Sequence, residues 1–69
     1  MTVIERQHLR DELMERYDLS RRQADDITMY LKDNSKETLN AKEAKSIVGI
    51  GNKVIDKIKS HPIFKEEVD

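Results

Sequence analysis

Apolar residues recur every three to four positions in four segments of the chain, and polar stretches separate these segments. This spacing is typical of amphipathic α-helices, because it places the apolar side chains on one face. We expect helices over residues 3–16 or 17, 21–32, 41–48 and 52–60. The pattern therefore predicts an all-α domain of four helices that spans residues 1–69.

Local signals mark where these helices start and stop. In a capping box, a Ser, Thr or Asn is followed three residues later by Glu or Gln, and both side chains bind backbone amides at the helix start. Three such pairs open the first three segments: Thr2 with Glu5, Ser20 with Gln23, and Asn40 with Glu43. Pro62 ends the fourth helix, because the residue before a proline is biased away from helix.

The apolar stripes also predict the core. The residues of the first two helices expected to face inward are Ile4, Leu9, Leu13, Met14, Tyr17, Ala24, Ile27, Tyr30 and Leu31. We expect Leu39 to anchor the loop before the third helix, and Ile63 and Phe64 to fold back on the bundle. Residues 65–69 are expected to form a frayed tail.

Composition narrows the function classes. The chain has 69 residues and no cysteine, which excludes disulfides and a thiolate metal site. His8 and His61 have no companions at ligand spacing, so we expect neither a metal ion nor another cofactor. The sequence contains no apolar run long enough to span a membrane and no signal-peptide pattern. We therefore expect a cytoplasmic protein, or a nuclear one in a eukaryote.

Positive charge gathers in one segment although the formal net charge of the chain is −1. Residues 41–61 carry five lysines against two acids, whereas residues 1–40 carry seven basic residues against nine acids. The net charge argues against a dedicated nucleic-acid binder, but the gathering of positive charge on one segment reduces the weight of this argument. We expect a modest affinity for nucleic acid that depends strongly on salt.

The tight sequence Gly49-Ile50-Gly51 separates the last two predicted helices. Gly49 stands where a helix often ends in a left-handed residue, and Gly51 stands just before the next helix. Ile50 is expected to point inward. This arrangement leaves the backbone amides of Gly51, Asn52 and Lys53 unpaired at a helix start, where an anion such as a phosphate fits.

The stretch VGIGNKVIDKI resembles the helix-hairpin-helix motif of DNA-repair and recombination proteins. In that family the hairpin, here residues 41–61, holds the sugar–phosphate backbone without reading bases. The residues that match the motif are Ile47, Gly49, Ile50, Gly51, Lys53 and Ile58. Val48 stands where proline is common, and Ile55 stands where alanine is common.

Residues 15–30 and 42–58 together resemble the amino-terminal lyase domain of DNA polymerase beta, a type of domain also found in family X polymerases and structure-specific nucleases. The resemblance implies that Lys57 occupies the position of the Schiff-base lysine and Lys53 that of a phosphate-binding lysine. Lys45 and Arg16 fall on two further basic positions of the same pocket. Ser20 stands where that lyase has a pocket tyrosine.

The expected function is sequence-independent binding to the DNA backbone in repair or replication, with gaps, ends and junctions as candidate sites. The expected phosphate-binding residues are Gly49, Gly51, Asn52, Lys53, Lys45 and Arg16. Two alternatives stay open. One is an interaction module that inhibits or recruits a polymerase, a nuclease or another nucleic-acid enzyme through acidic residues (Asp11, Glu12, Asp25, Asp26). The other is an abasic-site or deoxyribose-phosphate lyase with Lys57 as its nucleophile.

Overall fold

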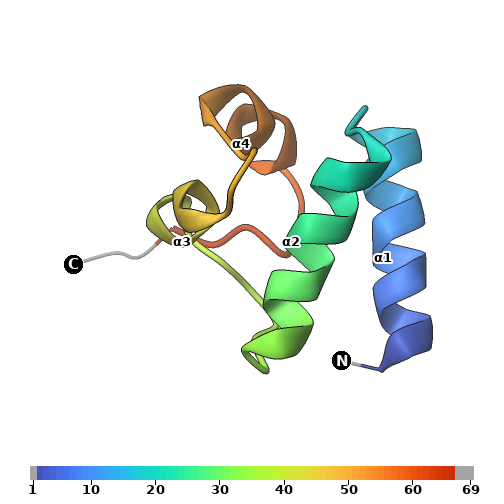
Figure 1. Ribbon diagram of the computed structural model, residues 1–69. Coiled ribbons are helices and arrows are strands. Elements are labelled where there is room, and N and C mark those ends of the chain that lie inside the picture. Colours follow the sequence, from blue (N-terminus) through green and yellow to red (C-terminus); the bar gives the residue numbers. More distant parts are fainter. Residues whose placement is uncertain (1, 67–69) are drawn as a thin grey trace.

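The computed structural model, which describes residues 2–66, confirms an all-α architecture (Figure 1). Its four helices are α1 (Val3–Arg16), α2 (Arg21–Asp33), α3 (Ala41–Ser46) and α4 (Asn52–Ile58). The long helices α1 and α2 pack against each other, and the short helices α3 and α4 form a hairpin on the far side of α2. Across residues 2–66 no helix is long and apolar enough to cross a membrane.

All three predicted capping boxes are present. The side chains of Thr2, Ser20 and Asn40 each accept a hydrogen bond from the amide three residues later. In each case the Glu or Gln at that third position accepts from the amide of the capping residue in return. The starts of α1, α2 and α3 are therefore determined by local side-chain chemistry.

The last two helices are shorter than predicted. Helix α3 ends at Ser46 rather than at residue 48, because Ile47 adopts an extended conformation (φ −81°, ψ 126°) and its amide bonds to the carbonyl of Ala44 at 3.1 Å. Helix α4 ends at Ile58 rather than at residue 60, and the amide of His61 closes a turn on the carbonyl of Ile58 at 2.9 Å. The hydrogen bond at each of these two ends joins an amide to the carbonyl three residues earlier, instead of four residues earlier as in an α-helix.

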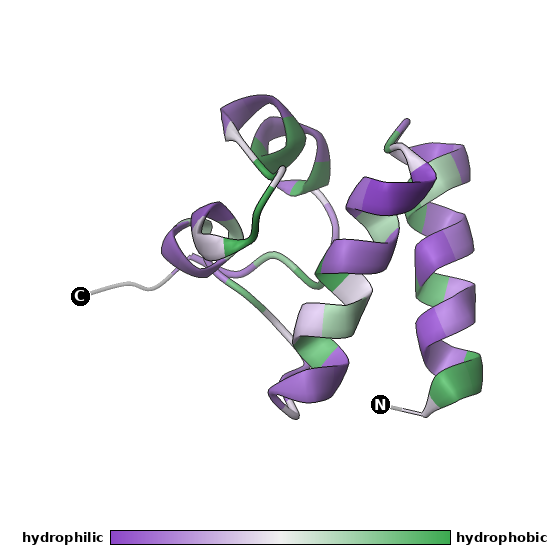
Figure 2. Ribbon diagram, in the orientation of Figure 1, coloured by the Kyte–Doolittle hydropathy of each residue, from purple (hydrophilic) through white to green (hydrophobic). Residues whose placement is uncertain are grey.

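One core prediction is wrong: Ile4 is 65% exposed. Successive residues of an α-helix are rotated by about 100°, so Ile4 lies about half a turn away from the fully buried Leu13. The core itself contains residues from all four helices and from the connections between them: Leu13, Leu19, Ala24, Ile27, Leu31, Leu39, Ala44, Ile50, Val54, Ile55, Ile58 and Ile63. Figure 2 shows apolar residues on the turn before α4 and on the connection after it.

Thr28 is a buried polar residue that the apolar pattern did not identify. It has no exposed surface, and its hydroxyl donates to the carbonyls of Ala24 and Asp25 at 2.9 and 3.0 Å. This back-bonding within α2 satisfies the hydroxyl and allows a threonine to occupy the core.

Leu39 and Ile63 are buried in the core, as predicted, and the chain after α4 returns to the loop before α3. The amide of Leu39 donates to the carbonyl of Ile63 at 2.8 Å, and the amide of Lys65 donates to the carbonyl of Leu39 at 2.9 Å. These two bonds form a short parallel bridge between Leu39 and Phe64. The backbone is therefore held as far as Lys65, and residues 67–69 of the predicted frayed tail lie outside the described residues.

Candidate nucleic-acid interface

The connection between α3 and α4 is a tight turn over residues 47–50. The amide of Ile50 donates to the carbonyl of Ile47 at 3.2 Å, which closes the turn. Gly49, at the third position, has a φ of +89°. A type II turn requires this left-handed conformation there, and glycine adopts it without a steric penalty. Ile50 is buried (5% exposed), so it attaches the turn to the core as predicted.

The start of α4 differs from the starts of the other helices because nothing caps it. Gly51 precedes the helix in an extended conformation (φ −116°, ψ −170°) and has no side chain that could accept a hydrogen bond. Its carbonyl accepts from the amides of Val54 and Ile55, both at 3.1 Å. Among the residues that the structure describes, the amides of Gly49, Gly51, Asn52 and Lys53 have no hydrogen-bond partner.

The space in front of this turn is open. A Cβ atom added to Gly49 or Gly51 would meet nothing within 4 Å. The four residues that carry the unpaired amides are exposed, and α3 and α4 do not merge into one continuous helix. A ligand with negatively charged oxygens can approach these amides directly.

Free cations lie on either side of the turn. Lys53 is exposed on the first turn of α4, and Lys45 is exposed on the last turn of α3. Arg16 is exposed at the end of α1. Within residues 2–66 none of these three side chains makes an ion pair. Their charges are therefore available to a phosphate.

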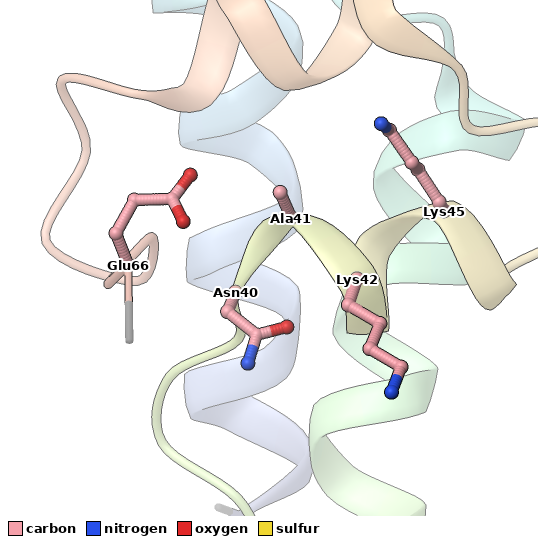
Figure 3. A pocket seen from close by; sticks show the side chains of 5 residues that line it. All are labelled: Asn40, Ala41, Lys42, Lys45 and Glu66. Atoms are coloured by element: carbon pink, nitrogen blue, oxygen red, sulfur yellow. The ribbon is translucent and has the colours of Figure 1, made fainter. Parts of the chain in front are cut away.

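Lys45 also lines an open pocket of about 430 Å³ at the start of α3 (Figure 3). Asn40, Ala41, Lys42 and Glu66 complete its lining. Figure 3 shows Glu66 on one side of this pocket and the two lysines on the other. Because a carboxylate faces the lysines, the pocket is a poorer phosphate site than the turn before α4.

Lys57 connects α4 to the link between α1 and α2. Its Nζ donates to the carbonyl of Asp18 at 3.0 Å and lies 3.8 Å from the Asp18 carboxylate. Asp18 is left-handed, with a φ of +56°. The contact places Lys57 near the end of α1, whose last residue is Arg16. Two of the expected basic residues, Lys53 and Lys57, therefore lie on α4, and Arg16 lies two residues before the Asp18 that Lys57 contacts.

The contacts of Lys57 and Ser20 bear on the expected lyase chemistry. A lysine that forms an imine attacks through a free electron pair on Nζ, and Nζ of Lys57 donates a hydrogen bond to the carbonyl oxygen of Asp18. The hydroxyl of Ser20 accepts from the amide of Gln23 at 3.1 Å, so this side chain caps α2. Both side chains thus make contacts within the fold.

The acidic residues expected to dock onto a partner are largely engaged inside the molecule. The carboxylate of Asp25 lies 3.7 Å from Arg6 and 3.6 Å from Arg10. Arg10 also lies 3.4 Å from Asp11. Glu12 is hydrogen-bonded to His61. Within the described part of the chain, Asp26 alone of the four expected acids makes no ion pair.

Glu43 connects α3 to α2 and to the loop between them, and the predicted capping box accounts for only one of its contacts. Its carboxylate accepts from the amide of Asn40 and from the hydroxyl of Tyr30, each at 3.2 Å, and it forms an ion pair with Lys36. The hydrogen bond from Lys36 is the main reason why the pKa of Glu43 is lowered. Burial, and then the hydrogen bond to Glu43, raises the pKa of Tyr30. Tyr30 and Lys36 carry no sequence signal for this contact.

The structure thus places Gly49 and Gly51 in the exposed connection between α3 and α4, and it places Asn52, Lys53 and Lys57 on α4. The described residues include no group of three or more His, Cys, Asp or Glu side chains that could hold a metal ion. Comparison of the chain with models of protein families, with curated proteins and with solved structures found no match.

Proposed function

We propose that this protein binds the sugar–phosphate backbone of DNA, without reading its sequence, through the turn between α3 and α4. The observation that carries the proposal is the open start of α4, where three successive amides (Gly51, Asn52, Lys53) have no partner among residues 2–66. Phosphate oxygens accept hydrogen bonds from such amides, and the positive end of a helix favours a negative charge. The resemblance of this stretch to the helix-hairpin-helix motif points to the same ligand.

Nearby cations support the amides. Lys53 adds a mobile positive charge at the turn itself, and Lys57 adds another one turn further along α4. If two or three phosphates are neutralised, the logarithm of the binding constant falls with the logarithm of salt concentration with a slope of about −2 to −3. Binding of this kind is weak for a single domain, and a partner or a second copy on the same DNA would strengthen it.

The proposed contacts carry no base information. Backbone amides and ammonium groups bind phosphate oxygens, which are the same at every step of the DNA, whereas sequence is read at base edges in the grooves. We therefore expect similar affinity for duplexes of unrelated sequence. Intact, gapped and branched DNA expose different phosphates to the turn, and any preference among them would result from this difference in access.

The test is a titration of labelled duplex and gapped DNA at low and moderate salt. Different variants separate the contribution of the lysine charge to DNA binding from that of the backbone amides. Lys53→Glu removes a proposed phosphate contact and introduces repulsion, so we expect a loss of about tenfold or more in affinity. Lys32→Glu, which makes the same charge change at an exposed position near the end of α2, is the matched control. Equal losses in the two variants would show a general effect of charge and would reject the site.

A proline variant tests the amides directly. Asn52 is the first residue of α4 and follows an extended glycine, and proline is well tolerated at this position. Asn52→Pro deletes one unpaired N–H while leaving the helix intact. We expect it to weaken DNA binding several-fold with little change in thermal stability. Val3→Pro, at the first position of α1, is the control and should leave DNA binding unchanged.

A further inference from the structure

The side chain of His61 is buried beside the segment that follows α4, and both of its ring nitrogens are hydrogen-bonded. Nε2 meets a carboxylate oxygen of Glu12, and Nδ1 accepts from the amide of Ile63 at 3.0 Å. A backbone N–H can only donate, so the proton of the neutral ring lies on Nε2. Nδ1 is therefore the ring atom that takes up a further proton.

Ile63 connects this imidazole to the bridge that holds the chain after α4. Its amide donates to His61, and its carbonyl accepts from the amide of Leu39 at 2.8 Å. The amide of Lys65 donates to the carbonyl of Leu39 at 2.9 Å, which completes the bridge between Leu39 and Phe64. A displacement of Ile63 therefore loosens the contact between the chain after α4 and the loop before α3.

The surroundings of the imidazole determine which partner it loses on protonation. Two titratable side chains face the ring: Glu12 of α1, and Tyr17 just after α1, whose ring meets it edge-on at 5.1 Å between centroids. Within residues 2–66 no charged side chain of α2 or α3 bonds to the ring, and Lys57 and Lys59 at the end of α4 pair with aspartates instead. A positive charge on the ring strengthens its bond to a carboxylate. The ring therefore stays with Glu12 and gives up the amide behind it.

We infer that protonation of His61 loosens the chain after α4 from the loop before α3, so that this contact is a pH-sensitive switch. The proton added to Nδ1 converts it from an acceptor into a donor that opposes the N–H of Ile63. Histidine gains its charge between about pH 8 and pH 5, a range in which carboxylates stay ionised. The switch uses no residue of the turn proposed to bind DNA, and it does not depend on that function.

The experiment measures amide hydrogen exchange of the ¹⁵N-labelled full chain by NMR between about pH 7.5 and about pH 5. Protection factors correct for the pH dependence of intrinsic exchange, and each one is divided by the mean for the buried residues of α2, so that global unfolding cancels. The relative protection of Leu39, Ile63 and Lys65 should fall about tenfold as the imidazole titrates, because a buried donor loses its acceptor. The ring resonances of His61 report its titration in the same samples.

Two substitutions at position 61 separate the roles of the two ring nitrogens. His61→Asn keeps an acceptor for the amide two residues later, as in an Asx turn, and does not titrate. Its relative protection should be high and independent of pH. His61→Gln extends a donor toward Glu12 but leaves no acceptor in the place of Nδ1, so its relative protection should be low throughout. His8→Asn, at the exposed histidine of α1, is the control and should keep the wild-type pH dependence.

A fall in relative protection that His61→Asn abolishes and His8→Asn retains supports the inference. The inference is overturned if relative protection stays constant while His61 titrates, as it would if α2 lost protection equally. A parallel fall in the wild-type chain and in His61→Asn also overturns it, because another group would then be responsible. If a variant at position 61 does not fold, the wild-type titration with its His8→Asn control still decides between these results.

Discussion

His61 and Glu12 are hydrogen-bonded to each other although 49 residues separate them in the chain. The imidazole of His61 is 7% exposed, and its Nε2 meets a carboxylate oxygen of Glu12. The other ring nitrogen, Nδ1, accepts the amide proton of Ile63 at 3.0 Å. The ring of Tyr17 meets the imidazole edge-on at 5.1 Å between centroids. His61 therefore joins the segment after α4 to α1.

These contacts determine the tautomer of His61. Because Nδ1 accepts a hydrogen bond from the amide of Ile63, the neutral ring must carry its own proton on Nε2, which donates to Glu12. Long-range ¹H–¹⁵N correlation spectra of the neutral imidazole should show the Nε2–H form. A spectrum of the Nδ1–H form would contradict this arrangement.

Removal of the acceptor should destabilise the protein. We expect Glu12→Ala to lower the free energy of unfolding by about 1–2 kcal/mol, because the buried Nε2–H loses its partner. Urea denaturation followed by circular dichroism measures this change. Glu15→Ala, on the same helix, removes an exposed carboxylate that makes no ion pair within residues 2–66, and it should change stability by less than about 0.5 kcal/mol.

Glu43 should make stability depend on acid pH. Its pKa is lowered in the folded protein, mainly by the hydrogen bond from Lys36, against an ordinary value of 4.5. A carboxyl group of this kind contributes stability above pH 4.5 and loses that contribution as the pH falls through its lower folded pKa. Thermal melting between pH 7 and pH 3 should show this loss, and Glu43→Gln should be less stable at pH 7 but flatter below pH 4.5.

Glu37→Gln is the control for this pH dependence. Glu37 is exposed in the loop before α3, next to Lys36, and makes no ion pair with any residue between 2 and 66. Its variant should keep the wild-type pH dependence. If Glu43→Gln and the wild-type chain lose stability in parallel on acidification, other carboxylates dominate and the role assigned to Glu43 is wrong.

A serine at position 51 should increase stability and weaken DNA binding at the same time. Gly51 already has the extended conformation of a capping residue but lacks a side chain to cap α4. The hydroxyl of Gly51→Ser can accept from the amide of Lys53 or Val54, which stabilises the helix by roughly a few tenths of a kcal/mol. The same hydroxyl occupies the amides proposed for phosphate, so affinity for DNA should fall several-fold. Unchanged affinity in a more stable variant would contradict the proposed site.

Gly49→Ala provides the contrast to Gly51→Ser. Its Cβ meets nothing within 4 Å, but a φ of +89° strains any residue with a side chain. We expect a loss of stability of about 1–2 kcal/mol. Melting curves of the two glycine variants should therefore shift in opposite directions.

Lys57 should act as a structural and electrostatic residue. Its Nζ donates to the carbonyl of Asp18, and its side chain is 42% exposed. Lys57→Gln should weaken DNA binding modestly and reduce the magnitude of the salt slope by less than about 1. Borohydride treatment in the presence of abasic DNA should trap no covalent adduct. An adduct that Lys57→Ala abolishes would instead support the lyase.

The helix starts could be predicted from the sequence because capping is local. Thr2, Ser20 and Asn40 bind amides only three residues away, so the sequence pattern contains the whole interaction. A break between the last two helices was predictable for the same reason, since Gly49 and Gly51 signal backbone conformations directly. Its position was expected at residues 49–51, whereas the structure forms the turn over residues 47–50. The ends of α3 and α4 could not be predicted from the sequence, because a tight turn and a further helical hydrogen bond are alternative conformations at each end.

Contacts between distant segments could not be predicted. His61 with Glu12, and Glu43 with Tyr30, depend on how the helices pack, and no spacing in the sequence encodes them. The acidic residues illustrate the consequence. The sequence predicts that Asp25 is exposed, but in the fold its carboxylate forms ion pairs with Arg6 and Arg10 of α1.

The central claim is that the unpaired amides at the start of α4 hold a DNA phosphate. The most direct measurement is an NMR titration of the ¹⁵N-labelled chain with a short gapped duplex at low salt. The claim predicts that the amide resonances of Gly51, Asn52 and Lys53 shift progressively and that the shifted residues are confined to positions 45–57 and the adjoining end of α1. The claim would be contradicted if the amide resonances at the start of α4 did not shift while those of other residues did. It would also be contradicted if DNA left the whole spectrum unchanged.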